Sequence, residues 1–243
     1  MKIIAIIPAR YKSSRFEGKP LADLCGKPMI WWVYNQVIKV KELEEVVVAT
    51  DDERIAKVCD EFNINYIITR NNHNTSTERL FEVAQNKKAD YYLCINGDEP
   101  LIDPEIIRKI LNIKDVNKDF YVSNLMTKIK DPVEVVDNTN IKVVTDNKNN
   151  AIYMSRSPIP HPKSSMNFEY RKHLRVLLYN YNALKFFSES NRGTIENIED
   201  INELRFIENG YNIKMIEVEA ATLSVDTPKD LDKVKSIIEQ RNV

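Results

Sequence analysis

The segment IIPARYKSSRFEGKP, residues 6–20, follows a short apolar run and is unusually rich in positive charge. Four of its residues are cations: Arg10, Lys12, Arg15 and Lys19. The whole chain has a net charge of −1, so this concentration of cations is a local feature. Together with the backbone N–H groups of Ser13, Ser14 and Gly18, the cations suit a polyphosphate, which carries several charges along its length. The segment lacks the G-x-x-x-x-G-K-[ST] pattern of a P-loop. The competing interpretation is a solvated loop with scattered basic residues.

Two acidic residues follow strand-like apolar runs and precede predicted helices. Asp98 lies in NGDEP, residues 96–100, and Asp226 lies in SVDTPKDL, residues 224–231. Ligands of an open parallel sheet bind outside the carboxyl ends of its strands, so we expect both acids to meet the cationic loop there. Carboxylates beside a polyphosphate are the usual way in which proteins hold Mg²⁺. The alternative for both acids is helix capping, although Thr227 is the better cap for the last helix.

Strand-like and helical patterns alternate through the first half of the chain. The strands are expected at 2–7, 44–50, 65–69 and 89–96, and the helices at 28–40, 51–63, 77–88 and 103–113. This alternation predicts βαβ units and a mostly parallel sheet with helices on both faces.

The second half of the chain is less regular. Strands are expected at 120–129, 141–146, 151–155, 173–181 and 211–219, and helices at 197–210 and 227–240. We expect a single α/β domain over residues 1–243, with a smaller dimerisation or lid insertion at about 130–195.

Composition excludes several classes of protein. Lys+Arg is 35 and Asp+Glu is 36, so no overall field attracts nucleic acid or an anionic membrane. No apolar run approaches the ~20 residues of a membrane span, and the first ten residues do not resemble a secretory signal. The cysteines, Cys25, Cys59 and Cys94, are odd in number and widely spaced, which predicts neither disulfides nor zinc and fits a reducing, cytoplasmic setting.

Seven segments together resemble the 3-deoxy-manno-octulosonate cytidylyltransferases, the CMP-Kdo synthetases. In chain order they are IIPARYKSSRFEGKPL, VVVATDDERI, TSTERLFEV, NGDEP, SRSPIP, KHL and SVDTPKDL, and the resemblance runs from residue 3 to about 238. The related CMP-sialate synthetases usually have Gly-Gly-Ser-Lys in the first segment, so RYKSSR favours the Kdo branch. The resemblance implies a Rossmann-like nucleotidyltransferase fold and a homodimer. It also implies Mg²⁺-dependent transfer of CMP from CTP to the anomeric hydroxyl of a sugar acid, with release of pyrophosphate, for lipopolysaccharide or capsule synthesis.

The resemblance also implies roles for individual residues. The nucleotide positions are Ala9, Arg10, Ser14, Arg15, Lys19, Thr77, Arg79 and Asn96. Arg10, Arg15, Lys19 and Asp98 are the expected catalytic residues, and Asp98 and Asp226 the expected magnesium ligands. The sugar-acid positions are Asn96, Arg156, His173, Asn202 and Glu203.

The chain departs from the family pattern on the sugar side. Asn96 stands where the family usually has Gln, Arg175 and Leu177 replace a Gly and a Tyr, and Asn202–Glu203 replaces an acidic–Gln pair. A hydroxyl-binding pocket that changes its partners changes its substrate, so the acceptor is expected to be Kdo, a variant of it, or another small acid.

Two other classes of function compete with this interpretation. A nucleotide-sugar glycosyltransferase would be expected to show an Asp-x-Asp pair, whereas Asp98 is followed by Glu99 and Pro100. A non-catalytic nucleotide-binding module would be expected to have lost the cationic loop or the two acids, and the chain keeps them.

Overall fold

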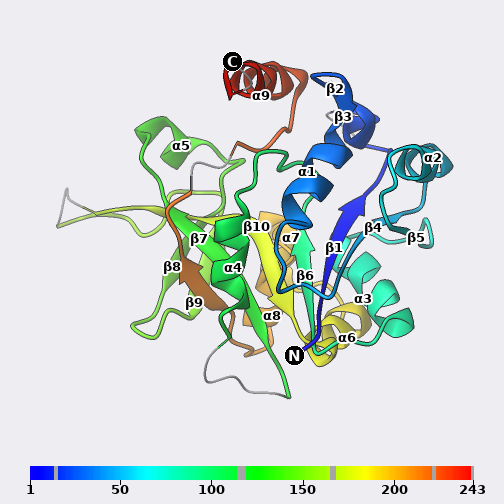
Figure 1. Cartoon of the computed structure of the whole chain (residues 1–243). Helices are drawn as coiled ribbons and strands as arrows, with labels where there is room; N and C mark the ends of the chain where they lie inside the picture. The colour runs from blue at the N-terminus through cyan, green and yellow to red at the C-terminus, as the bar shows by residue number, and fades with distance from the viewer. Residues whose placement is uncertain (14–15, 114–118, 165–167, 221–222, 242–243) are drawn as a thin grey trace. The chain divides into compact units, whose positions relative to one another are not determined.

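The computed structural model describes residues 1–13, 16–113, 119–164, 168–220 and 223–241. The chain divides into two compact units, one made of residues 1–108 and 221–243 and the other of residues 109–220 (Figure 1). Ser14 and Arg15, both expected in the nucleotide site, lie outside the described residues.

The sheet of the first unit is parallel throughout. Strand β1 (Ile3–Ala9) lies between β6 (Tyr91–Ile95) and β4 (Glu45–Thr50), and β5 (Tyr66–Ile68) continues the sheet beyond β4. Residues Ile3 to Ile7 are at most 1% exposed, as expected for a central strand that is covered on both faces. The four strands predicted in this half are confirmed.

The predicted helices of the first unit are also confirmed. They are α1 (Met29–Val37), α2 (Glu53–Glu61), α3 (Ser76–Asn86), α4 (Pro104–Leu111, which crosses the boundary between the units) and α9 (Pro228–Arg241). Asp52 caps α2 by accepting from Arg54 N, and Thr75 caps α3 by accepting from Glu78 N. A short helix η1 (Lys19–Leu21) and a hairpin of β2 (Asp23–Leu24) and β3 (Lys27–Pro28) lie between β1 and α1 and were not predicted.

A small apolar cluster anchors the segment that carries Asp226. Val225 is fully buried among Leu24 and Met29 at one side and Leu231 and Val234 of α9 at the other. Burial of such side chains stabilises the arrangement by roughly 1.5–3 kcal/mol each. The backbone at 225 and 226 is therefore held firmly within the first unit.

The second unit contains a mixed sheet. Strand β7 (Val122–Lys128) pairs antiparallel with β10 (Arg171–Tyr179) and parallel with β11 (Lys214–Glu217). Strands β8 (Lys142–Thr145) and β9 (Ala151–Ser155) form a hairpin, and β8 also pairs with β10. The β7–β10 register shifts between His173 and Leu177, so residues 174–176 form a bulge.

The helices of the second unit depart from the sequence prediction. The single helix expected at 197–210 is wrong: α7 (Thr194–Glu199) ends where Asp200 adopts a left-handed conformation at φ 51°, and α8 (Leu204–Glu208) begins separately. Gly210, at φ 79°, follows α8 as expected. Helices α5 (Pro132–Val136) and α6 (Tyr181–Glu189) were not predicted; Asn180 caps α6 by accepting from Ala183 N.

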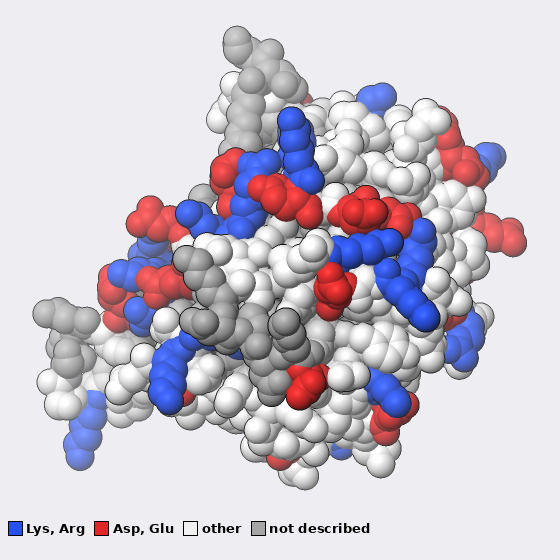
Figure 2. Space-filling model, turned by 60° about the horizontal axis from the view of Figure 1, so that its bottom comes forward, with Lys and Arg blue, Asp and Glu red and all other residues white. Residues whose placement is uncertain are grey.

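The predicted α/β class, with parallel strands and flanking helices, is confirmed. Residues 130–195 fall inside the second unit, and their role in dimerisation or as a lid stays a prediction. Among the described residues, no helix has the length and apolar character needed to cross a membrane. On the face drawn in Figure 2, cationic and anionic side chains lie next to one another, in keeping with the balanced composition.

Candidate active site

Lys19 lies between the two acids that the sequence singles out. Its Nζ is 2.9 Å from Asp98 Oδ2 and 3.6 Å from Asp226 Oδ1, and it donates to the Val225 carbonyl at 2.9 Å. The three charged side chains are only 9–16% exposed, so their charges interact with little screening by water. The expectation that the cationic loop, NGDEP and SVDTPKDL meet is confirmed for these residues.

The helices that follow the two acids are capped by other residues. Asp103 caps α4 instead, by accepting from Glu105 N at 2.9 Å. Thr227 and Asp230 cap helix α9. Asp230 N donates to Thr227 Oγ1 at 3.4 Å, and Thr227 N donates to Asp230 Oδ2 at 3.0 Å. Other residues therefore cap α4 and α9, and both Asp98 and Asp226 form ion pairs with Lys19.

Backbone contacts fix the positions of these acids. Asp98 comes three residues after the end of β6, and its carbonyl accepts from Val225 N at 2.9 Å. Lys19 donates to the carbonyl of the same Val225, which directly precedes Asp226. The backbone of Val225 is therefore linked to Lys19, Asp98 and Asp226. The sequence contained no signal for this carbonyl as a ligand of the lysine.

The cationic loop leaves the carboxyl end of β1. Ala9 is buried at the last position of the strand, and Arg10 is exposed immediately after it. Gly18 N donates to the Tyr11 carbonyl at 2.8 Å, which closes the base of the loop just before Lys19.

The residues expected near the nucleotide at the start of α3 are buried. Thr77 and Arg79 are 3% and 4% exposed. The Arg79 guanidinium lies 3.2 Å from Asp51 Oδ2 and also donates to Thr69 Oγ1, so it ties α3 to the segments that follow β4 and β5. Asn96 is half-buried directly after β6. The roles of Thr77, Arg79 and Asn96 toward a nucleotide stay predictions.

In the second unit, Arg156 is held by backbone carbonyls. Its guanidinium donates to Glu199 O at 2.7 Å, Asn138 O at 3.0 Å and Asp200 O at 2.9 Å. Three of the five N–H groups of a guanidinium are thus engaged with the protein. Arg156 orders the 138–140 and 199–200 segments as well as offering positive charge.

Glu199 is a positioning residue that sequence reasoning missed. It accepts from Ser155 Oγ at 2.5 Å, Tyr153 OH at 3.2 Å and Arg156 N at 2.9 Å. Burial opposes ionisation of Glu199, but these hydrogen bonds outweigh it and lower the pKa of the carboxyl. An acid inside a short helical pattern gave no sign in the sequence that it would bond the neighbouring strand.

The bulge in β10 places His173 and Arg175 near other charged groups. Burial, followed by the charges of Arg175 and Arg156, lowers the pKa of His173 to about 3. The ring is half-buried by its exposed area, while its Nδ1 is closed to water. His173 is therefore neutral at ordinary pH.

Glu203 lies in the same electrostatic neighbourhood. Burial raises the pKa of its carboxyl, Glu196 adds to this, and Arg175 and Arg156 oppose it. Asn202 beside it is half-buried, and Leu177 is 5% exposed and packs in the core of the unit. The unit thus brings together most of the positions expected on the sugar side.

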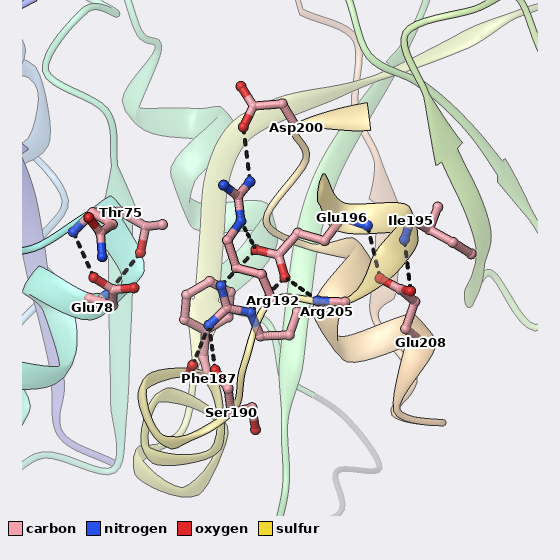
Figure 3. Close-up of polar contacts among 12 residues, drawn as sticks. Thr75, Glu78, Phe187, Ser190, Arg192, Ile195, Glu196, Asp200, Arg205 and Glu208 are labelled. Carbon is pink, nitrogen blue, oxygen red and sulfur yellow. Dashed lines mark hydrogen bonds and ion pairs between the residues drawn. The ribbon is translucent and has the colours of Figure 1, made fainter. Parts of the chain in front are cut away.

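A buried ion pair fixes the helices on either side of Asn202 and Glu203 (Figure 3). Arg205 donates from Nε and NH2 to the two carboxylate oxygens of Glu196, each at 2.7 Å, and both side chains are at most 2% exposed. Arg205 also bonds the Phe187 carbonyl of α6. Glu208 of α8 accepts from two backbone N–H groups, of Ile195 and Glu196, in the first turn of α7, so α6, α7 and α8 are joined.

Comparison with known proteins defines the class of the molecule. A family model described as cytidylyltransferase matches residues 4–216, which contain the cationic loop, Asp98 and the sugar-side positions. The inositol-1-phosphate CTP transferase from T. maritima has a TM-score of 0.71 at 16% identity, covering 98% of this chain and 95% of that one, and shows the shared fold.

Closer relatives then identify the family. The 3-deoxy-manno-octulosonate cytidylyltransferase of Escherichia coli is 38% identical over 98% of this chain and 97% of its own length. The mitochondrial one of Arabidopsis thaliana is 40% identical over 100% of this chain and 85% of its own length. A solved structure of CMP:2-keto-3-deoxy-manno-octonic acid synthetase complexed with CTP superposes with a TM-score of 0.93 at 38% identity, covering 99% of this chain and 100% of that one. The chain belongs to the 3-deoxy-manno-octulosonate cytidylyltransferase family.

Proposed function

We propose that the protein transfers CMP from CTP to the anomeric hydroxyl of a 3-deoxy-2-keto sugar acid, Kdo or a variant of it, and releases pyrophosphate. The observation that carries this proposal is the convergence of Lys19 with Asp98 and Asp226 beside the cationic loop. The names of the relatives and the CTP in the solved relative support the same substrates.

The reaction needs charge stabilisation more than covalent help. The sugar hydroxyl attacks the α-phosphorus in line with the departing pyrophosphate, so negative charge shifts onto that group. Arg10, Arg15 and Lys19 are assigned to neutralise this charge.

The donor set fits Mg²⁺, which binds through one or two carboxylates together with phosphate oxygens. Within the described part of the chain, no cluster of three or more His, Cys, Asp or Glu side chains is suited to a metal. Asp98 and Asp226 would therefore hold the ion together with the nucleotide rather than alone. When bound, Mg²⁺ supplies charge neutralisation on the phosphates.

The position of Lys19 indicates an exchange of partners. The ammonium lies against the two carboxylates and donates to the Val225 carbonyl. Asp98 and Asp226 would hold the metal of a metal–nucleotide complex, and the flexible Lys19 side chain would then be available to the phosphates. Lys19 would thus neutralise the two carboxylates before a metal–nucleotide complex binds them.

The acid is assigned to the second unit. Arg156 retains two N–H groups for a carboxylate, and the neutral ring of His173 is the proposed partner of a hydroxyl. Asn202 and Glu203 complete the proposed set of this unit, and the role of Asn96, in the first unit, stays a prediction. A homodimer in the cytoplasm, acting on small molecules in lipopolysaccharide or capsule synthesis and not on nucleic acid, is part of the same proposal.

The test is pyrophosphate release from each NTP with Mg²⁺ and a panel of sugar acids. The proposal expects release only with CTP and an acid, and almost none from Asp98→Asn, which removes a metal ligand. A glycosyltransferase would release no pyrophosphate from CTP, and a non-catalytic module would bind CTP without turnover.

A further inference from the structure

The ring of Tyr11 packs against the backbone that closes the cationic loop. Gly18 adopts a left-handed conformation at φ 68°, and a Cβ added there would lie 3.1 Å from the Tyr11 ring. The Gly18 N–H bonds the Tyr11 carbonyl at 2.8 Å. The two ends of the loop therefore meet at one residue, immediately before Lys19.

Arg54 holds the same ring from helix α2. The Arg54 Cζ lies 3.3 Å from the centroid of the Tyr11 ring. Its Nε and NH2 atoms bond the two carboxylate oxygens of Asp52 at 2.9 and 2.7 Å. Asp52 is in turn fixed as the N-cap of α2. The guanidinium is thus oriented by a rigid element and presents its face to the ring.

We propose that Asp52, Arg54 and Tyr11 form a clamp that preorganises the described ends of the cationic loop, residues 10–13 and 16–19, for the triphosphate. Arg54 and Tyr11 are positioning residues in this proposal, which rests on the proposed function. The cations of the loop repel one another, so a loop without the clamp would occupy many arrangements before binding. Ordering such a loop on binding costs affinity, and a loop that is already ordered avoids that cost.

The clamp contacts no reacting atom, so its loss is expected to act on nucleotide binding rather than on the transfer step. The strength of an exposed cation–π contact corresponds to a change of about two- to fivefold in a dissociation constant. Arg54→Ala should therefore raise the Kd for CTP by about that factor and leave kcat at saturating CTP unchanged.

The matched control is Lys57→Ala. Lys57 is exposed on α2, one turn after Arg54, and its removal deletes the same charge from the same helix. Calorimetry with CTP and no acceptor gives the Kd, and pyrophosphate release gives kcat. Tyr11→Phe should behave as wild type because it keeps the ring, whereas Tyr11→Leu and Arg54→Ala should each weaken binding and be non-additive when combined.

A second measurement needs neither CTP nor catalysis. Trypsin cleavage after Arg10 or Lys12, followed by mass spectrometry, should accelerate in Arg54→Ala and not in Lys57→Ala. Equal cleavage rates and equal Kd values in these two variants would overturn the clamp. Absence of CTP binding by the wild type, with cleavage still accelerated in Arg54→Ala, would instead reject the proposed function and retain the clamp.

Discussion

At the scale of single residues, Lys19 has two partners of opposite kind in the proposed reaction: carboxylates before binding and phosphates afterwards. Removing the charge of Lys19 should strengthen metal binding by the two carboxylates and weaken stabilisation of the phosphates during transfer. Lys19→Met keeps an unbranched side chain and leaves Asp98 and Asp226 without the ammonium between them.

Lys19→Met is expected to bind Mn²⁺ more tightly than wild type when no nucleotide is present. It is also expected to lose roughly 2–4 kcal/mol of transition-state stabilisation, by analogy with the loss of one donor at an oxyanion site. Electron paramagnetic resonance measures free Mn²⁺, and pyrophosphate release measures kcat/KM. Lys12→Met, which removes an exposed charge of the same loop, is the control for metal binding; equal Mn²⁺ affinity in all three proteins would contradict the exchange.

The lowered pKa of His173 makes stability depend on pH. The folded state keeps this ring neutral down to a pKa of about 3, whereas the unfolded chain protonates it near 6.5. The unfolded state therefore binds more protons in this window, and stability falls as pH falls from about 6.5. Between about pH 7.5 and about pH 5.5 the loss from this residue is about 1.4 kcal/mol.

His173→Asn should lack that part of the pH dependence, as measured by urea unfolding at the two pH values. The raised pKa of Glu203 lowers the stability as pH rises above the pKa of this carboxyl in the unfolded chain. Glu203 is present in both wild type and His173→Asn, so its contribution cancels in the comparison. His161→Asn, at an exposed position, should keep the wild-type dependence. If wild type and His173→Asn lose the same stability on acidification, the ring is protonated in the folded state.

At the scale of elements, α7 and α8 are too short to be stable alone and depend on their contacts. The Glu196–Arg205 pair joins them to α6, and Glu199 and Asp200, at the end of α7, hold Arg156. Damage to the pair should therefore affect both stability and the assigned acid site.

Glu196→Gln leaves the buried charge of Arg205 uncompensated and is expected to cost about 3–5 kcal/mol of unfolding free energy. Arg192→Ala, which removes a 40%-exposed partner of the same carboxylate, should cost no more than about 1 kcal/mol. Denaturant unfolding measures both. A cost for Glu196→Gln as small as that for Arg192→Ala would mean that the pair contributes little to holding the helices.

At the scale of the whole molecule, the nucleotide-side segments match the family pattern while the sugar-side positions depart from it. Arg175 is half-buried and acts electrostatically on both His173 and Glu203, so it adds charge to the assigned acid region. The protein is expected to prefer CTP among the nucleotides and to use Kdo less well than a modified acid.

A changed hydrogen-bond partner in a buried site costs about 1–3 kcal/mol, so kcat/KM for Kdo should be lower by about tenfold to a hundredfold. The measurement is pyrophosphate release with CTP and a panel of acids, with Arg175→Gly beside wild type. Kdo as the best acceptor, at a kcat/KM of ~10⁴ M⁻¹s⁻¹ or more, would contradict this expectation.

The sequence by itself determined the parallel βαβ half, because buried strands and amphipathic helices there follow local periodicity. It also determined which motif residues were candidates, since Lys19, Asp98 and Asp226 lie in the segments that follow predicted strands. The break at Asp200 was missed because a left-handed residue inside a helical pattern leaves no periodic signal. The tertiary structure alone decided that both acids pair with Lys19, that Lys19 bonds the Val225 carbonyl and that Arg54 stacks on Tyr11. Each of these depends on residues distant in sequence, and local patterns carry no information about such pairings.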